Sequence, residues 1–247
     1  MRFIHFVPPY NHRSAGIRAV HYFAYLMRKA GYNAYVNNIG NPWVVPIYEG
    51  FADESDIVIY PEYIGGVNLL RAKNIARWIL FYPSQLFGDC IIPANEYVMP
   101  YAKWLYDETK SQYAGELTED NILELPTIEA GLFNPAPKTI ESAYWVYKGA
   151  HHYDPTLVPP NSVEITATFP STRQALAKLL GATKTFYTFD HDTAMSFEAK
   201  LSGCKVILLE KGKEPKEDLR ISSCMNEEED VKLVVKQAER MMRFYDR

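Results

Sequence analysis

The feature that most constrains the fold is an alternation of strand and helix patterns that runs along the chain twice. A short β-rich run at residues 2–7 is followed by a loop and then by apolar residues at helical spacing over residues 16–30. Gly31 stands where a helix C-cap glycine belongs, and a second strand pattern follows at residues 33–37. A strand, a helix and a strand in this order indicate the start of a parallel sheet.

The first half continues in the same way up to a proline-rich stretch. We expect further strands at residues 56–60, 78–82, 97–99 and 122–125, and a helix at residues 68–76. Residues 126–138 then carry three prolines, a glycine and an asparagine, a composition typical of a linker. We therefore predict two domains, at residues 1–135 and 136–247.

The second half repeats the alternation. We expect strands at residues 143–147, 163–167, 185–189 and 205–209, and helices at residues 171–180, 193–202 and 227–244. Pro170 would open the first of these helices, Gly181 would close it, and Asn226 would cap the last. The predicted fold class is α/β, with two Rossmann-like domains. Because open α/β sheets bind ligands at the carboxyl ends of their strands, the loops after the strands are where a site is expected.

The composition narrows the class of protein. The 247 residues are 47% hydrophobic and 23% charged, which is typical of a globular chain. The net charge of −4 gives no electrostatic reason to expect nucleic acid as the partner. The three cysteines have no CxxC spacing, which favours the reduced thiols of a cytoplasmic protein. No run approaches the roughly 20 apolar residues of a membrane span, and we interpret residues 2–7 as a strand, not a signal peptide.

The most informative stretch is residues 187–207, where a strand ends in the polar turn Asp190-His191-Asp192 and a helix begins near Thr193. Backbone N–H groups at a helix start, here at Thr193 and Ala194, can hold a diphosphate with help from the helix dipole. The formal DxD spacing of the turn suits a metal in other settings. Its position before a helix favours a phosphate turn, so we predict no metal.

Glu198 lies inside the same helix, eight residues after Asp190. A carboxylate about one turn into such a helix can accept hydrogen bonds from ribose hydroxyls, a task that acidic residues perform in dinucleotide-binding folds. The alternative is that the aspartates of the turn only cap the helix and that Glu198 lies on a solvated face, since aspartate is a favoured N-cap. The spacing alone leaves both interpretations open.

This stretch resembles the carboxylate–seven residues–carboxylate motif of retaining GT-B glycosyltransferases. In that family the second carboxylate runs into an alanine, a later glycine and a PVI-like strand. Glu198-Ala199, Gly203 and Val206-Ile207 are similar to that half, and Asp190 falls on the first carboxylate. Two features depart from the family pattern: the first carboxylate is aspartate, and the turn at residues 191–194 contains no glycine.

The resemblance implies a role for each matched residue. Asp190 would lie near the donor sugar, Glu198 would bind the nucleotide ribose, and the amides at Thr193 and Ala194 would meet the phosphates.

A second signal is the run WVYKG, which ends at Lys148 and Gly149. A basic residue after the first strand of the second domain resembles the diphosphate-binding Arg or Lys of the family. A cation there would neutralise the leaving nucleoside diphosphate as the glycosidic bond breaks. The alternative is an exposed surface lysine. Arg173 and Lys184 are lesser candidates for the same task.

A third signal is the run SAGIRAVH after the first strand, which resembles the start of the first helix in GT-B proteins. Gly16 within it would allow close approach of the backbone to a ligand, or it is a simple turn residue. Glu62 and residues 82–84 follow predicted strands and would face the acceptor. His12 and His21 are candidates for a base or a sugar contact.

These observations together predict a metal-independent, cytoplasmic glycosyltransferase of the GT-B type. Its two domains would face each other across a cleft, with a nucleotide sugar on the second and a saccharide or glycoconjugate acceptor on the first. The alternatives are an enzyme that glycosylates modified DNA and a nucleotide- or sugar-binding module without catalysis. The predicted catalytic residues are Asp190 and Lys148, and the predicted donor-binding residues are Glu198, Thr193, Ala194, Gly149 and Gly16.

Overall fold

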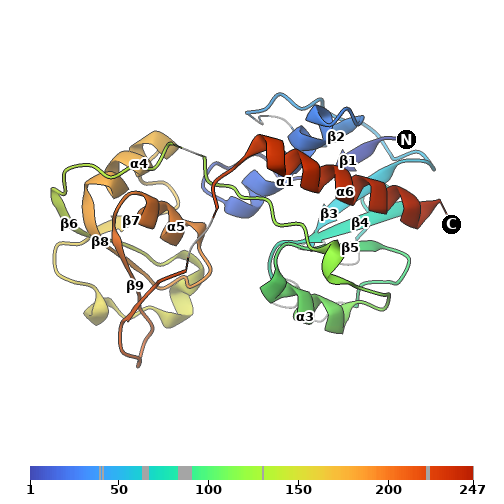
Figure 1. Ribbon diagram of the computed structural model, residues 1–247. Coiled ribbons are helices and arrows are strands. Elements are labelled where there is room, and N and C mark those ends of the chain that lie inside the picture. Colours follow the sequence, from blue (N-terminus) through green and yellow to red (C-terminus); the bar gives the residue numbers. More distant parts are fainter. Residues whose placement is uncertain are drawn as a thin grey trace. The chain divides into compact units, whose positions relative to one another are not determined.

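The computed structural model describes residues 1–38, 40, 42–62, 67–82, 91–129, 131–220 and 223–246. The chain forms two compact α/β units, each built on its own sheet (Figure 1). The first unit consists of Met1–Leu125 together with Asn226–Arg247, and the second unit of Pro126–Met225. The α/β class is thus as predicted, but the division of the chain differs from the expected one: the boundary comes earlier, and the chain returns to the first unit at its C-terminal end.

The sheet of the first unit has five parallel strands in the order β2-β1-β3-β4-β5. They are β1 (Phe3–His5), β2 (Ala34–Val36), β3 (Ile57–Pro61), β4 (Asn74–Ile79) and β5 (Tyr97–Pro100). Every residue of β1, β3 and β5 is buried. Parallel strands covered on both faces read as continuous apolar runs, which explains why the sequence revealed most of them.

Among the described residues of the first unit, three α-helices and a short 3-10 helix accompany the sheet. They are α1 (Ala15–Lys29), α3 (Lys103–Gln112), η2 (Glu119–Asn121) and α6 (Glu227–Tyr245). The N-terminus of α1 is capped by Ser14, whose Oγ accepts a hydrogen bond from the Ile17 amide at 3.3 Å. After its last turn Gly31 adopts φ +88°, the left-handed conformation expected of a C-cap glycine.

The C-terminal helix α6 packs against α1, which is why it belongs to the first unit (Figure 1). The Tyr22 hydroxyl on α1 donates a 2.9 Å hydrogen bond to the buried carboxylate of Asp230. Tyr97 on β5 donates to Gln237 at 2.8 Å, and Val234 is fully buried. The sequence predicted a helix at residues 227–244, but it did not identify the surface against which this helix packs.

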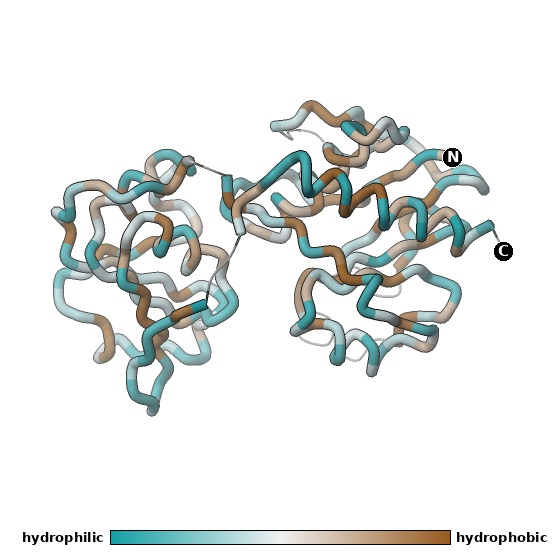
Figure 2. The backbone as a smooth tube through the Cα atoms, in the orientation of Figure 1, coloured by the Kyte–Doolittle hydropathy of each residue, from teal (hydrophilic) through white to brown (hydrophobic). Residues whose placement is uncertain are grey.

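The sheet of the second unit has the order β10-β9-β8-β6-β7. Its strands are β6 (Ile140–Trp145), β7 (Val163–Ile165), β8 (Thr183–Thr188), β9 (Lys205–Leu208) and β10 (Lys216–Glu217). All pairs are parallel except β9 with β10. In Figure 2, β9 is hydrophobic and the turn after it is hydrophilic.

The helices that the structure describes in this unit are α4 (Arg173–Ala182), α5 (Ala194–Leu201) and the 3-10 helices η3 (Tyr147–His152) and η4 (Pro155–Leu157). The core of the second unit joins residues of β6, β8, α4 and α5 with Ile128 and Phe133 of the preceding segment. Part of the predicted linker is therefore core. Among the described residues, no helix combines the length and the apolar character needed to cross a bilayer.

The helix expected at residues 68–76 is wrong. The Asn68 side chain accepts a hydrogen bond from the Ala72 amide at 2.8 Å and donates to the Ala72 carbonyl at 2.7 Å. This side chain closes a turn in place of helical backbone bonds, as asparagine tends to do. Arg71 within the turn has φ +54°, and β4 begins at Asn74, before the expected strand start.

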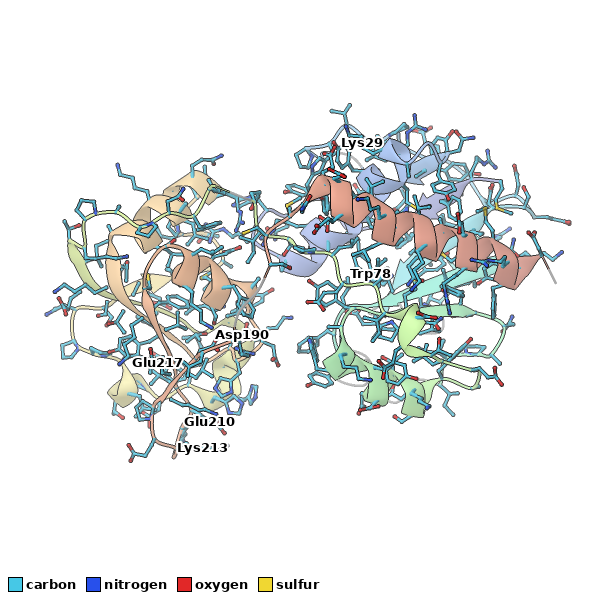
Figure 3. The ribbon with its side chains drawn as sticks, in the orientation of Figure 1. Lys29, Trp78, Asp190, Glu210, Lys213 and Glu217 are labelled. Atoms are coloured by element: carbon cyan, nitrogen blue, oxygen red, sulfur yellow. The ribbon has the colours of Figure 1, made fainter. Side chains whose placement is uncertain are left out.

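The strand expected at residues 122–125 is also wrong. Within this segment the Leu123 amide donates to the carbonyl of Pro100, the last residue of β5, at 2.9 Å. The Trp78 indole donates to the Leu123 carbonyl at 3.0 Å (Trp78 is labelled in Figure 3). A buried apolar run can thus pair its backbone polar groups through such single hydrogen bonds without becoming a strand of the sheet.

Three residues expected at helix ends differ in detail from their predicted roles. Thr172, not Pro170, precedes the first turn of α4, and its Oγ1 accepts a hydrogen bond from the Ala175 amide. Gly181 lies inside α4, where a Cβ would come within 2.9 Å of the Asn134 carbonyl. Asn226 precedes α6 as expected but makes no capping bond with its side chain.

Candidate functional site

The topology of the second sheet defines a switch point between β6 and β8. From β6 the chain crosses to β7 on one side and then returns across β6 to β8 on the other. Ligands of open α/β sheets bind outside the carboxyl ends of the strands at such a point. Trp145 and Thr188 pair in register at these ends, and the Phe189 amide donates to the Trp145 carbonyl at 3.0 Å.

Gly149 joins the two loops that leave the switch point. A Cβ at this position would lie 2.1 Å from the carbonyl carbon of Phe189 and 2.6 Å from the Asp190 nitrogen. Only glycine permits this approach of two backbones. Gly149 was predicted to contact the donor. The structure gives it another task, which is to hold the loop carrying Lys148 against the turn carrying Asp190.

Asp190 is buried beside this contact, with 7% of its surface exposed (Figure 3). Burial raises the pKa of its carboxyl group, and the positive charge of Lys148 opposes part of that rise. The Asp192 amide donates to its Oδ1 at 3.3 Å. The two predicted catalytic residues are therefore electrostatic neighbours, with Lys148 exposed to solvent.

The helix α5 starts directly after this turn. Thr193 is its N-cap residue, and its Oγ1 accepts a hydrogen bond from the Met195 amide at 3.3 Å. Ala194 is the first helical residue. The N-cap is thus Thr193 and not one of the two aspartates to which the alternative interpretation gave that role, and the helix dipole at this end favours an anion.

Glu198 does not present its carboxylate to solvent. It is 2% exposed, and Arg173 on α4 donates to its Oε1 at 2.7 Å. Arg173 also donates to Glu129, and its guanidinium lies over the Phe133 ring. A buried carboxylate already engaged with an arginine is not an accessible acceptor for a ribose. The expected ribose contact of Glu198 and the expected phosphate contact of Arg173 are replaced by an interior ion pair.

A second group of charges lies on the outer side of the turn. Arg220 donates to the His191 carbonyl, and its Nη1 lies 3.6 Å from Oδ1 of Asp192. Asp218 binds both Arg220, at 2.9 Å, and Lys200, at 3.0 Å. These hydrogen bonds overcome the effect of burial and lower the pKa of Asp218 to about 2.

Three imidazoles gather at the same edge of the sheet. The rings of His151 and His152 lie 3.8 Å apart, and His152 stacks on His191 at 5.5 Å. Glu210, labelled with its partner Lys213 in Figure 3, lies 3.7 Å from Nδ1 of His152. The part of the chain that the structure describes contains no group of three or more His, Cys, Asp or Glu arranged to hold a metal.

The candidates of the first unit are largely engaged within the protein. His21 is fully buried and its Nε2 lies 3.0 Å from the Pro8 carbonyl. Glu62 accepts a 2.8 Å hydrogen bond from the Leu80 amide. A Cβ at Gly16 would make only an ordinary contact, 3.8 Å from Leu80, so packing alone does not require glycine there.

The remaining predicted candidates lie in loops or on the surface, and two of them lie outside the described residues. His12 is half-buried in the loop before α1, and its carbonyl accepts from Arg18 at 2.6 Å. The Tyr82 ring contacts the Trp104 ring at a centroid distance of 5.4 Å, while residues 83 and 84 lie outside the described residues. Lys184 is a surface residue paired with Glu141.

Sequence reasoning missed two residues of the switch-point region of the second unit. Arg220 lies in a stretch without periodic pattern, and nothing local marks it as a neighbour of the 190–192 turn. Tyr147 was included only in a strand pattern, although it lies beyond the end of β6. Its position directly before Lys148 was the available signal.

Comparison with known proteins adds no assignment to this geometry. No protein-family model matches the chain, and no curated protein matches its sequence. The function must therefore be argued from the residues at the switch point.

Proposed function

We propose that this protein is a nucleotide-sugar-dependent glycosyltransferase whose donor binds at the switch point of the second unit. The observation that carries the proposal is the contact at Gly149, which holds the Lys148 loop against the Asp190 turn at the start of α5. A cation, a helix N-terminus and a buried carboxylate at one sheet edge suit a diphosphate with a hydroxyl-rich group attached.

The proposed chemistry assigns a task to each of these groups. Lys148 and the amides at the start of α5 bind the diphosphate. As the bond from the sugar to the diphosphate breaks, negative charge grows on the leaving oxygen, and fixed positive groups stabilise it most at that moment. Asp190 accepts hydrogen bonds from the sugar. Glu198 takes no part, because it is engaged with Arg173.

The acceptor side belongs to the same proposal. In a GT-B arrangement the first unit would supply the acceptor site across a cleft, and Gly16 at the start of α1 would line it. Saccharides or glycoconjugates are the proposed acceptors. The formal charge of −4 disfavours modified DNA as an acceptor, because binding to phosphates relies on cations.

A second candidate is a nucleotide- or sugar-binding module without transferase activity. The ion pair between Glu198 and Arg173 favours it, because the second carboxylate of the resembling motif is withdrawn from the ligand. Both candidates predict binding at the same place, and only the first predicts turnover.

The test combines binding and transfer. A thermal-shift screen of nucleoside diphosphates and nucleotide sugars identifies the donor, since a ligand that binds the folded state raises its apparent stability. With that donor labelled in the sugar, we expect Lys148→Ala to lower turnover about 100-fold, the scale for removing one group that stabilises developing charge. Turnover that is unchanged in Lys148→Ala contradicts the proposed role. Binding without any release of sugar would support the second candidate.

Lys184→Ala is the matched control. Lys184 is an exposed lysine of the same unit, paired with Glu141 at 2.6 Å near the other end of β8. It should leave both donor binding and turnover unchanged. Equal losses in the two variants would point to a general effect of charge and not to a contact with the diphosphate.

A further inference from the structure

Tyr147 combines two features that folding alone does not favour. Its φ is +34°, in the region of positive φ that glycine, asparagine and aspartate populate far more readily than a bulky residue. Its side chain is also 57% exposed. Strained residues persist where the surroundings impose them, and they cluster at sites that hold ligands.

The surroundings of Tyr147 fix its ring in place. The ring stacks on Trp145 with centroids 5.1 Å apart and an interplanar angle of 27°. Trp145 belongs to the core on the face of the sheet covered by α4 and α5. The loop behind Tyr147 is held by Gly149 against the backbone of Phe189 and Asp190. One face of the Tyr147 ring thus rests on the core residue Trp145, and the backbone that follows Tyr147 is held in place through Gly149.

The neighbours of the ring indicate what it could bind. Lys148 is the next residue in the chain, and Asp190 offers carboxylate oxygens at the same switch point. An aromatic face at strand ends that also carry a hydrogen-bond acceptor suits a pyranose, which has an apolar C–H face and hydroxyl donors at its edge.

We propose that Tyr147 is the platform on which the sugar ring of the donor lies, and that it distinguishes a nucleotide sugar from the bare nucleotide. This inference rests on the proposed function. Connectivity favours the sugar over the nucleobase, because the sugar is bonded directly to the diphosphate that Lys148 would hold. The nucleobase is separated from the diphosphate by the ribose.

The test compares ligands with and without the sugar. Calorimetry would measure Kd for UDP and UDP-glucose, and for GDP and GDP-mannose, with the wild type, Tyr147→Phe and Tyr147→Asn. We expect Tyr147→Asn to raise the Kd of the nucleotide sugar about tenfold, a change of about 1.4 kcal/mol in binding free energy. The Kd of the nucleoside diphosphate should stay unchanged. Tyr147→Phe keeps the ring and should keep the preference.

Tyr153→Asn is the matched control. Tyr153 is in the same connection, is 36% exposed and packs on Phe189 at 5.1 Å, but its φ is an ordinary −68°. This variant should leave the ratio of the two Kd values unchanged. Asparagine tolerates positive φ, so Tyr147→Asn should also melt no lower than the wild type.

Each other outcome decides against the inference. If Tyr147→Asn raises the Kd of the nucleotide sugar and of the nucleoside diphosphate equally, the ring contacts the nucleobase. If neither Kd changes, the ring has no ligand role. A marked loss of thermal stability in Tyr147→Asn would show that the ring serves the fold. If the wild type binds neither pair nor any nucleotide sugar of the thermal-shift screen, the proposed function fails and the platform with it, which distinguishes that failure from a failure of the platform alone.

Discussion

The two units have the same order for their first four strands but differ in the connection that leaves the first strand. After β1 the chain forms the 15-residue helix α1, and after β6 it forms only the 3-10 helices η3 and η4. In the first unit the helix places Arg18 and His21 in the interior. In the second unit the shorter connection leaves Tyr147 and Lys148 exposed at the switch point. The same strand order therefore goes with buried side chains after the first strand of one unit and exposed side chains after the first strand of the other. The difference lies in the connection that leaves that strand.

A buried arginine–glutamate pair is present among the described residues of each unit, and the two pairs differ in their hydrogen bonds. Arg77 on β4 donates two hydrogen bonds to Glu96, whereas Arg173 donates one to Glu198 and is shared with Glu129. Removing one partner of a buried pair leaves a charge without compensation. The pairs can therefore serve as a matched probe of each unit.

The largest effect is expected at these pairs. Glu96→Ala should lower the free energy of unfolding by about 4 kcal/mol, and Glu198→Ala by about 3 kcal/mol, since Glu129 still compensates Arg173. Urea denaturation followed by fluorescence measures both. If Glu198→Ala leaves stability intact and abolishes donor binding, the glutamate serves the ligand and its interior role is wrong.

The next effect contrasts Gly149 of the second unit with Gly16 at the start of α1 in the first unit. Gly149→Ala should cost about 2 kcal/mol, because its Cβ would meet the backbone at 2.1 Å. Gly16→Ala should be neutral or stabilising by up to about 1 kcal/mol, because alanine favours a helix and its Cβ would make only an ordinary contact with Leu80. Thermal melts compare them. A larger loss at Gly16 than at Gly149 would reverse the comparison.

A smaller effect concerns the attachment of α6 to the first unit. Tyr22→Phe removes the hydrogen bond to buried Asp230 and should cost about 1 kcal/mol. Tyr25→Phe removes a more exposed bond to Glu227 and should cost less. Hydrogen exchange should quicken in α6 and α1 but not in α5. Faster exchange confined to the second unit would contradict the assignment of α6.

The smallest expected effect is on the pH dependence of the second unit. Because burial raises the pKa of Asp190, the folded state binds a proton there more tightly than the unfolded state. Stability therefore falls as the pH rises from the ordinary aspartate pKa of 3.8 through the raised pKa of the folded state. Asp190→Asn should stabilise the protein at pH 7 by less than about 1 kcal/mol and lose this advantage in acid.

Melting temperatures of Asp190→Asn between pH 3 and pH 8 would test this sign. Asp192→Asn, on the exposed part of the same turn, is the control and should show no such trend. A variant at Asp190 that is less stable at pH 7 than at pH 4, relative to wild type, would contradict the burial argument. If Asp190→Asn loses turnover and gains stability, the Asp190 carboxylate serves the ligand at a cost to the stability of the fold.

The local elements could be predicted from the sequence because their signals are local. The helical spacing of α1, its C-cap glycine and the apolar runs of β3 and β8 lie within a few residues of each other. The same logic placed Lys148 and Asp190 after strands, where a ligand site of a parallel sheet is expected. Asn68 escaped this reasoning, because its side chain replaces the backbone bonds on which the helix pattern depends.

The sequence by itself thus determined the α/β class and the loops in which a site could form. Only the tertiary structure decided that α6 joins the first unit, that Arg173 engages Glu198 and that Gly149 packs on the Asp190 turn. The physical reason is that each of these contacts joins residues distant in sequence, and its energy comes from burying one particular surface on another. The spacing of residues along the chain indicates which face of a helix or strand a residue occupies, but it does not indicate which other element packs against that face.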